Sequence, residues 1–258
     1  MTAARALAGT QRAAMAEAWA NRRGFWTQVI AMVVNDVAWI AFWVLFFHRV
    51  GAIRGWDSSK VLLLLAVLTT SAGLVLGMLG NARRIGRLAV EGDLDAALAL
   101  PVPPLAYLLV RRIDTTNLGD LAFGIVLFAV AGHPTPLRTL VFAAAVVVAA
   151  TILTGFLVAA GSVAFFAGRN EAGELGFHAM LMFASYPVDV FSGAAKALLY
   201  TVVPAAFVSA VPARLIDHFD GRLAATLVGV AALFAFGGWA LFTAGLRRYT
   251  SGAVWTRA

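Results

Sequence analysis

The chain concentrates oppositely charged side chains in one short part of its sequence. Residues 81–105 read NARRIGRLAVEGDLDAALALPVPPL and mix guanidinium with carboxylate groups. Such a surface suits the docking of a partner protein, although a solvated loop whose charges only orient the chain would also carry it. The residues concerned are Arg83, Arg84, Arg87, Glu91, Asp93 and Asp95.

A second polar feature, Asn35 and Asp36, interrupts an apolar run over residues 25–47. If this run crosses a membrane as a helix, Asp36 lies about 15 Å deep at about 1.5 Å per residue. A carboxylate at that depth costs about 2.5–3.5 kcal/mol. No Lys or Arg is expected beside it. Asp36 therefore either lines a wet cavity in a substrate path or belongs to a buried structural pair.

Three further polar residues, Asp114, Asn117 and Asp120, follow each other at intervals of three. This spacing places them on one broad face of a helix, near its inner end. We expect them to pair with Arg111, Arg112 or a neighbouring helix. The four histidines are far apart and the chain has no cysteine, so we expect no metal site.

The sequence lacks a loop that could hold the phosphates of ATP. Such a loop needs the pattern GxxxxGK[ST]. The only two lysines are Lys60 in SSKV and Lys196 in AAKA, and neither follows a glycine. We expect no catalytic residue and no bound cofactor in this chain, so ATP and Mg would have to bind to another polypeptide.

The composition indicates an integral membrane protein. Apolar residues make up 61% of the chain and charged residues 13%, with a mean hydropathy of +0.85, against about 45–50% and about 25% in soluble domains. The net charge of +7 therefore indicates cytoplasmic loops rather than nucleic-acid binding. All basic residues but Lys60 and Lys196 are arginine, which is typical of a high-GC bacterial genome.

The hydropathy pattern predicts an all-α membrane protein with six transmembrane helices, because a span needs about 20 apolar residues. An amphipathic helix over residues 1–24 precedes them. Prolines interrupt residues 187–216, where we expect two short re-entrant helices on the outer side. The predicted spans are residues 25–47, 61–80, 113–131, 137–167, 175–186 and 223–245.

The distribution of basic residues orients these spans. Thirteen of the 20 Lys and Arg residues fall on one side and seven on the other, which places both termini and residues 81–112 in the cytoplasm. Within this loop we expect a helix that Gly92 breaks. A second short helix, over residues 94–100, would have Asp93 as its N-cap and would end at Pro101.

Several segments in order resemble permease subunits of type-2 ATP-binding-cassette exporters, in the viologen-exporter-like branch. The resemblance covers most of residues 40–253, and residues 1–24 carry none of it. The similar segments are RGW at 54–56 with the following VLLLLA run, RLAVEGDLDAALALPVPPLAYLLVRRID at 87–114, NLGDLAFG at 117–124, YPVDVF at 186–191, VVPAAFVSAVPARLI at 202–216 and LRRYTSGA at 246–253.

The resemblance implies a single permease domain over residues 1–258, in which residues 81–112 carry a coupling helix that touches an ATPase. It also implies two ATP-binding-cassette ATPase subunits and a second permease chain, identical or homologous, in the bacterial cytoplasmic membrane. Glu171 and Glu174, in the second inner loop, either form a further ATPase contact or are only solvated.

Two other classes of function stay open as alternatives. A membrane-embedded lipid-modifying enzyme would need clustered acid–base or metal-binding residues near one membrane face, and a secondary transporter would show a repeat between its halves. The sequence shows neither feature. The substrate is not named by the sequence: hydrophobic cations, lipids and natural products all suit multidrug or lipid efflux.

Overall fold

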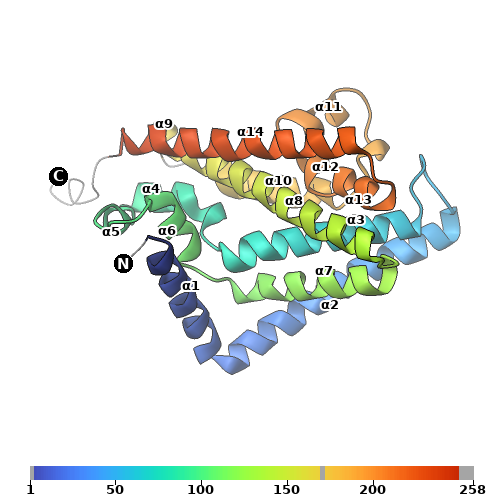
Figure 1. Cartoon of the computed structure of the whole chain (residues 1–258), viewed down its shortest axis with the longest axis horizontal. Helices are drawn as coiled ribbons and strands as arrows, with labels where there is room; N and C mark the ends of the chain where they lie inside the picture. The colour runs from blue at the N-terminus through green and yellow to red at the C-terminus, as the bar shows by residue number, and fades with distance from the viewer. Residues whose placement is uncertain (1–2, 169–171, 250–258) are drawn as a thin grey trace.

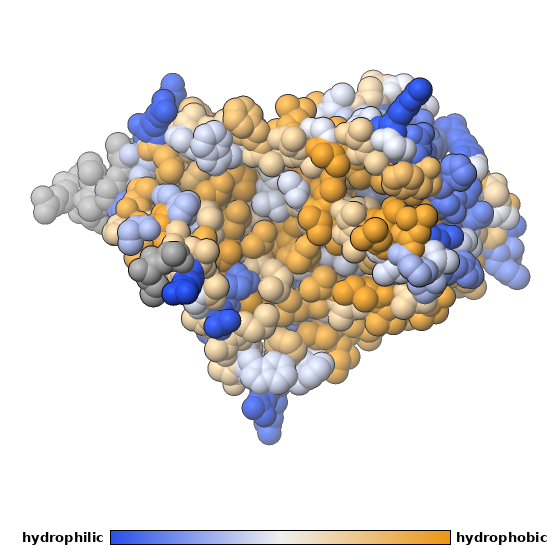
Figure 2. Space-filling model, in the orientation of Figure 1, coloured by the Kyte–Doolittle hydropathy of each residue, from blue (hydrophilic) through white to orange (hydrophobic). Residues whose placement is uncertain are grey.

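A computed structural model describes residues 3–168 and 172–249 of the chain. Within these residues every regular element is a helix, and β pairing is limited to one isolated bridge, Ile53 with Trp56. The long helices run along the molecule, and α1 with the short helices α4, α5 and α6 gathers at one end (Figure 1). Hydrophobic residues cover the middle of the face in Figure 2, and hydrophilic residues gather toward its edges. This distribution is the one expected of a protein that crosses a bilayer.

Four helices are long and apolar enough to cross a membrane, and they match four predicted spans. A fifth candidate is the pair α6 and α7, which is bent by 81° at the link between its helices. Helix α10, where the fifth span was predicted, has 13 described residues, fewer than the roughly 20 a span needs. The count of six spans therefore stays a prediction. The four helices are α2 (Arg22–Val50), α3 with its π-helical end η1 (Ser58–Gly77), α8 with α9 (Pro136–Ala167) and α14 (Gly221–Leu246).

Helices α3 and α8 form the centre of the molecule, and α2 and α14 flank it. The apolar windows of α3 and α8 are 78% and 67% buried, against 11% for α2 and 22% for α14. Close helix packing depends on small residues. Gly124 of α7 (Thr115–Ala131) leaves no room for a Cβ against Thr70, and Gly155 of α8 leaves none against Phe234 of α14. The exposed flank of α2, which includes Ile30, Val34 and Leu45, is an apolar surface that no other part of the single chain covers.

The segment after α10 (Ala172–Ala184) folds back on the bundle as three short α-helices, so the prediction of two was wrong in number. Helices α12 and α13 are largely buried and meet α3 and α8, as irregular backbone at bilayer depth requires. Pro212 lies in the first turn of α13, where its missing N–H is not needed. The elements are η3 (Val188–Val190), α11 (Gly193–Thr201), α12 (Ala205–Val208) and α13 (Ala210–Asp217).

Asp189 anchors this segment to the turn between α2 and α3. Its carboxylate accepts hydrogen bonds from the Trp56 indole at 2.8 Å and from Lys196 at 2.8 Å, and it pairs with Arg214. Its backbone carbonyl accepts a hydrogen bond from Arg54 at 2.6 Å. Asp189 therefore holds together elements that are about 130 residues apart in sequence, through three partners of its carboxylate and one of its backbone carbonyl.

The charged inner loop folds into two short helices, as predicted, but its cap differs. Helix α4 (Ile85–Glu91) ends at Gly92 with a positive φ of 82°, whereas the N-cap of α5 (Asp95–Leu98) is Leu94, without a side-chain cap. The prediction that Asp93 caps this helix is wrong. The backbone N–H of Asp95 instead donates to the carbonyl of Gly92 in a tight turn. The loop is completed by η2 (Ala82–Arg84) before α4 and by α6 (Pro104–Val110) after α5.

Candidate functional site

Asp36 and Asp120 face each other between α2 and α7. Asp36 is the central residue of the 29-residue helix α2, and the two residues are only 6% and 5% exposed. Their side chains are joined by a hydrogen bond, which requires a proton on one of the two carboxyl groups. Of the partners predicted for Asp120, the structure shows the neighbouring helix, α2, and neither Arg111 nor Arg112.

The carboxyl pair lies in the wall of a cavity of about 320 Å³ between α2, α3, α7 and α10. Asn35 also lines it, and the rest of the wall is mostly apolar and aromatic. Apart from the contact between the two carboxyl groups, Asp36 Oδ2 and Asp120 Oδ1 have no hydrogen-bond partner in the described part of the chain. The two interpretations of Asp36 thus combine, since the residue belongs to a buried pair and also lines a cavity. The aromatic residues of the wall are Trp39, Phe123, Phe177 and His178.

Arg83 connects the inner loop to the wall of this cavity. Its guanidinium lies 3.2 Å from the Asp114 carboxylate and 3.9 Å from that of Glu174, and 5.2 Å from the centre of the Phe177 ring. Asp114 is the N-cap of α7, and Glu174 lies in the first described turn of α10. Arg83 and Glu174 were predicted as ATPase contacts. The structure places them against each other, where they tie the loop to two helices of the bundle.

The remaining charged residues of the loop divide between its surface and a polar cavity. Arg84, Arg87, Glu91 and Asp93 line a cavity of about 860 Å³ together with α1 (Ala3–Ala20) and the start of α2. Arg87 and Glu91 form an i, i+4 pair at 3.8 Å that is about half exposed. Such a pair adds little stability, so these side chains stay available to a partner.

Two more predicted residues complete this group. Asp95 accepts a hydrogen bond of 2.9 Å from the hydroxyl of Tyr249. This bond fixes the short helix α5 to the residues that follow α14. Glu171 lies outside the described residues.

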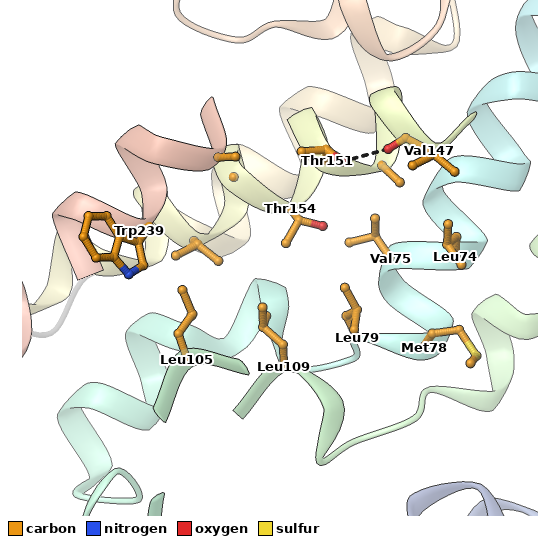
Figure 3. Close-up of a pocket in the computed structure, with 14 residues that line it drawn as sticks. Leu74, Val75, Met78, Leu79, Leu105, Leu109, Val147, Thr151, Thr154 and Trp239 are labelled. Carbon is orange, nitrogen blue, oxygen red and sulfur yellow. Dashed lines mark hydrogen bonds between the residues drawn. The ribbon is translucent and has the colours of Figure 1, made fainter. Parts of the chain in front are cut away.

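An apolar cavity of about 430 Å³ lies on the other side of the loop, between η1 (Gly73–Gly77), α6, α8 and α14. Figure 3 shows Leu105 and Leu109 of the inner loop pointing into it from one side and Thr154 of α8 from the other. The side chain of Trp239 lines its end. The loop therefore contacts the spans through apolar packing as well as through Arg83.

A model of the ABC-2 family of transporter proteins matches residues 33–253. The chain belongs to the ABC-2 transporter family. The matched range contains both carboxyl residues, the whole charged loop and the outer segment, and leaves out α1 and the first part of α2. No curated protein and no solved structure matches the chain.

Membership of the ABC-2 family confirms that the chain is a membrane component of a transporter without an ATPase site of its own. It implies association with an ABC ATPase. The resemblance to type-2 permeases is confirmed at this level, while the viologen-exporter-like branch stays a prediction.

Asp120 is the residue of this ABC-2 chain that sequence reasoning missed. Its signal was present, because Asp36, Asp114 and Asp120 were the three acids placed inside predicted spans and no cation was expected at the depth of Asp36. An unpaired acid in one span favours a partner in another span. Arg83 gave no comparable signal, because the sequence does not distinguish it from Arg84 and Arg87 in the same charged loop.

Proposed function

We propose that the chain is the permease subunit of an ATP-driven exporter of the viologen-exporter-like branch. It forms a translocation path with a second permease chain, identical or homologous, and two separate ATPase subunits supply the energy. The family match over residues 33–253 carries this proposal. The exporter has six spans, with both termini in the cytoplasm of a bacterium and its substrate among the drugs or lipids that leave the cell.

The inner loop is the coupling surface in this proposal. ATP and Mg bind to the partner ATPases, and their closure presses on residues 83–95. The charged side chains that line the polar cavity beside α1 are available for this contact. Arg83 then transmits the displacement, because it joins the loop to the N-cap of α7 and the first described turn of α10.

The flank of α2 is the face that the second permease covers. The apolar window of this helix is only 11% buried in the single chain, and large apolar residues such as Val34 and Leu45 are 63% and 66% exposed. The cavity that holds Asn35 and Asp36 opens beside this flank, where Trp39 and Met182 are partly exposed. Substrate therefore has a path along the interface between the two permeases.

The test is affinity purification of the chain from its native membrane, followed by measurement of ATP hydrolysis. We expect an ABC ATPase to co-purify and the complex to hydrolyse ATP, while the chain freed of partners hydrolyses none. ATP turnover by the isolated chain would refute the proposal. Substrate uptake into vesicles driven by an ion gradient, without any ATPase, would support the secondary-transporter alternative.

A further inference from the structure

We infer that the polar cavity between α1, the start of α2 and the inner loop binds the headgroup of an anionic phospholipid. The inference goes beyond the proposed function and uses two arginines, Arg111 and Arg112, to which that proposal gives no role. It rests on arginines that line the cavity without a carboxylate partner, and on the position of the cavity at the start of two helices of the bundle.

The cavity lies at the level where α2 and α7 begin. These helices start at Arg22 and Thr115 and pack against each other. The hydroxyl of Thr115 donates a hydrogen bond to the Gln28 side chain, and both residues line the cavity. Trp19 and Trp26, beside this end of α2, are 42% and 51% exposed. Tryptophans of this kind are typical of the boundary between hydrocarbon and water, so the cavity lies at the level of the lipid headgroups.

Three guanidinium groups of the cavity have no carboxylate partner. Arg84, Arg111 and Arg112 line it, and they take part in no ion pair within residues 3–168 and 172–249. The side chain of Arg84 is also half-buried, and a charge withdrawn from water needs an opposite charge close to it. Guanidinium groups bind phosphate oxygens through pairs of parallel hydrogen bonds. These arginines therefore favour a phosphate as the ligand.

The acidic residues of the cavity do not cancel its positive charge. Glu91 is paired with Arg87 at 3.8 Å, and Glu17 and Asp93 are exposed. With four arginines and three acidic residues in its wall, the cavity keeps one positive charge. A phosphodiester carries one negative charge and balances it.

The wall favours a phospholipid over a free phosphate ion. The volume of about 860 Å³ exceeds what one phosphate fills, and the apolar side chains of Phe25, Leu88 and Ile113 lie beside the polar groups. Such surfaces suit the glycerol and the first methylene groups of a lipid. The amide N–H groups of Asn21 and Gln28 are further donors, because their carbonyl oxygens already accept other hydrogen bonds. Basic cavities between membrane helices at one face of the bilayer are known to bind anionic headgroups.

Part of this wall is outside the range that the family model matches. Helix α1 and the first turns of α2 precede residue 33, where the match begins. In Figure 1 α1 lies at the same end of the molecule as the short helices of the inner loop. A bound headgroup would touch α1 on one side and Arg111 and Arg112 on the other, and so would hold α1 against the loop.

Titration of the purified full-length chain in detergent with soluble short-chain lipids, read out by native mass spectrometry, tests the inference. Dioctanoyl-phosphatidylglycerol is the anionic probe, and dioctanoyl-phosphatidylcholine has the same chains without a net charge. We expect the wild type to bind the anionic lipid about tenfold more tightly. Each arginine beside a phosphate contributes about fivefold, so Arg111→Gln, Arg112→Gln should lower this affinity by about tenfold or more.

Arg22→Gln, Arg23→Gln is the matched control. It removes the same charge from the start of α2, at two exposed positions that do not line the cavity in the described structure. The affinity for the anionic lipid should then change by no more than about threefold, since exposed charges are screened. An equal loss in both double variants would show diffuse attraction to a basic surface and would overturn the inference. Equal affinity of the wild type for the two lipids would overturn it as well, and this comparison needs no variant that has to fold.

Two further measurements separate the lipid from other occupants. Glycerol 3-phosphate should displace the anionic lipid only at a much higher concentration, and displacement at equal concentration would assign the cavity to a free phosphate and overturn the inference. The assay contains no ATPase, so its result is independent of the exporter proposal. If Arg111→Gln, Arg112→Gln bound the lipid like the wild type but no longer co-purified with an ATPase, the cavity would be a protein-docking surface, and the lipid site would be refuted.

Discussion

Arg83 and Asp114 form an ion pair of 3.2 Å that joins the charged inner loop to the start of α7. Both side chains are less than one-third exposed, and the guanidinium also lies over Phe177 of α10. A partly buried pair with an aromatic contact is stronger than a solvated one. This pair joins the charged loop to α7, one of the helices that line the cavity at Asp36 and Asp120.

Arg83→Gln should weaken that connection without preventing membrane insertion. We expect a loss of about 1 kcal/mol in stability, since the pair is partly exposed, together with a clear fall in substrate-stimulated ATPase activity. Thermal unfolding in detergent and ATP turnover of the complex measure the two effects. For stability, Arg87→Gln is the matched control, because its pair with Glu91 is half exposed and should cost less than about 0.5 kcal/mol. Equal losses of stability in the two variants would show that the Arg83 pair does not fix the loop to the bundle.

The inner loop offers a second contrast, between Asp93 and Asp95. Asp93 is exposed and caps no helix, so Asp93→Ala should change stability by less than about 0.5 kcal/mol. Asp95→Ala removes the acceptor of the Tyr249 hydroxyl and should cost about 1 kcal/mol. Unfolding midpoints of the two variants decide the matter. A larger loss of stability in Asp93→Ala than in Asp95→Ala would indicate that Asp93 caps α5 after all, against the structure.

The outer segment should depend on Asp189 more than on any one of its partners. Asp189→Ala leaves Lys196 and Arg214 facing each other without their shared carboxylate, and removal of one partner from a buried ionic group costs about 3–5 kcal/mol. Because Lys196 and Arg214 are 40% exposed, we expect about 2 kcal/mol. Trp56→Phe removes one hydrogen bond from the same carboxylate and should cost about 1 kcal/mol. The order of the two unfolding midpoints is the readout.

The sidedness of the chain can be tested with single cysteines, since the sequence has none of its own. Ala194→Cys in α11 and Asp217→Cys at the end of α13 are exposed positions and should react with a membrane-impermeant maleimide from outside intact cells. Asp93→Cys should react only after the cells are opened. Labelling of Asp217→Cys only from the cytoplasm would contradict the proposed topology.

The sequence alone predicts the long helices well, because hydropathy and helix breakers are local properties. Four predicted spans coincide with α2, α3, α8 and α14, and Gly92 ends a helix as expected. The contacts between distant residues were not predictable in the same way. The pairing of Asp36 with Asp120 depends on the packing of α2 against α7. The hydrogen bond from Trp56 to Asp189 forms only because the segment that contains Asp189 folds back on the bundle.

The error at Asp93 has a different cause. A carboxylate before a short helix is a good N-cap by residue type, but the turn after Gly92 places the N–H of Asp95 on a backbone carbonyl. Local geometry of this kind depends on two or three torsion angles that residue preferences do not determine. The same limit applies to the three short helices of the outer segment.

The central claim is that residues 83–95 contact an ABC ATPase, and a photo-crosslinking amino acid at Asp93 tests it most directly. The position is exposed and is not the N-cap of α5. In native membranes, illumination should attach the chain to an ATP-binding-cassette ATPase, and the same probe at Ala194 should not. A chain that co-purifies with its ATPase but yields the adduct from Ala194, or from neither position, would contradict this account.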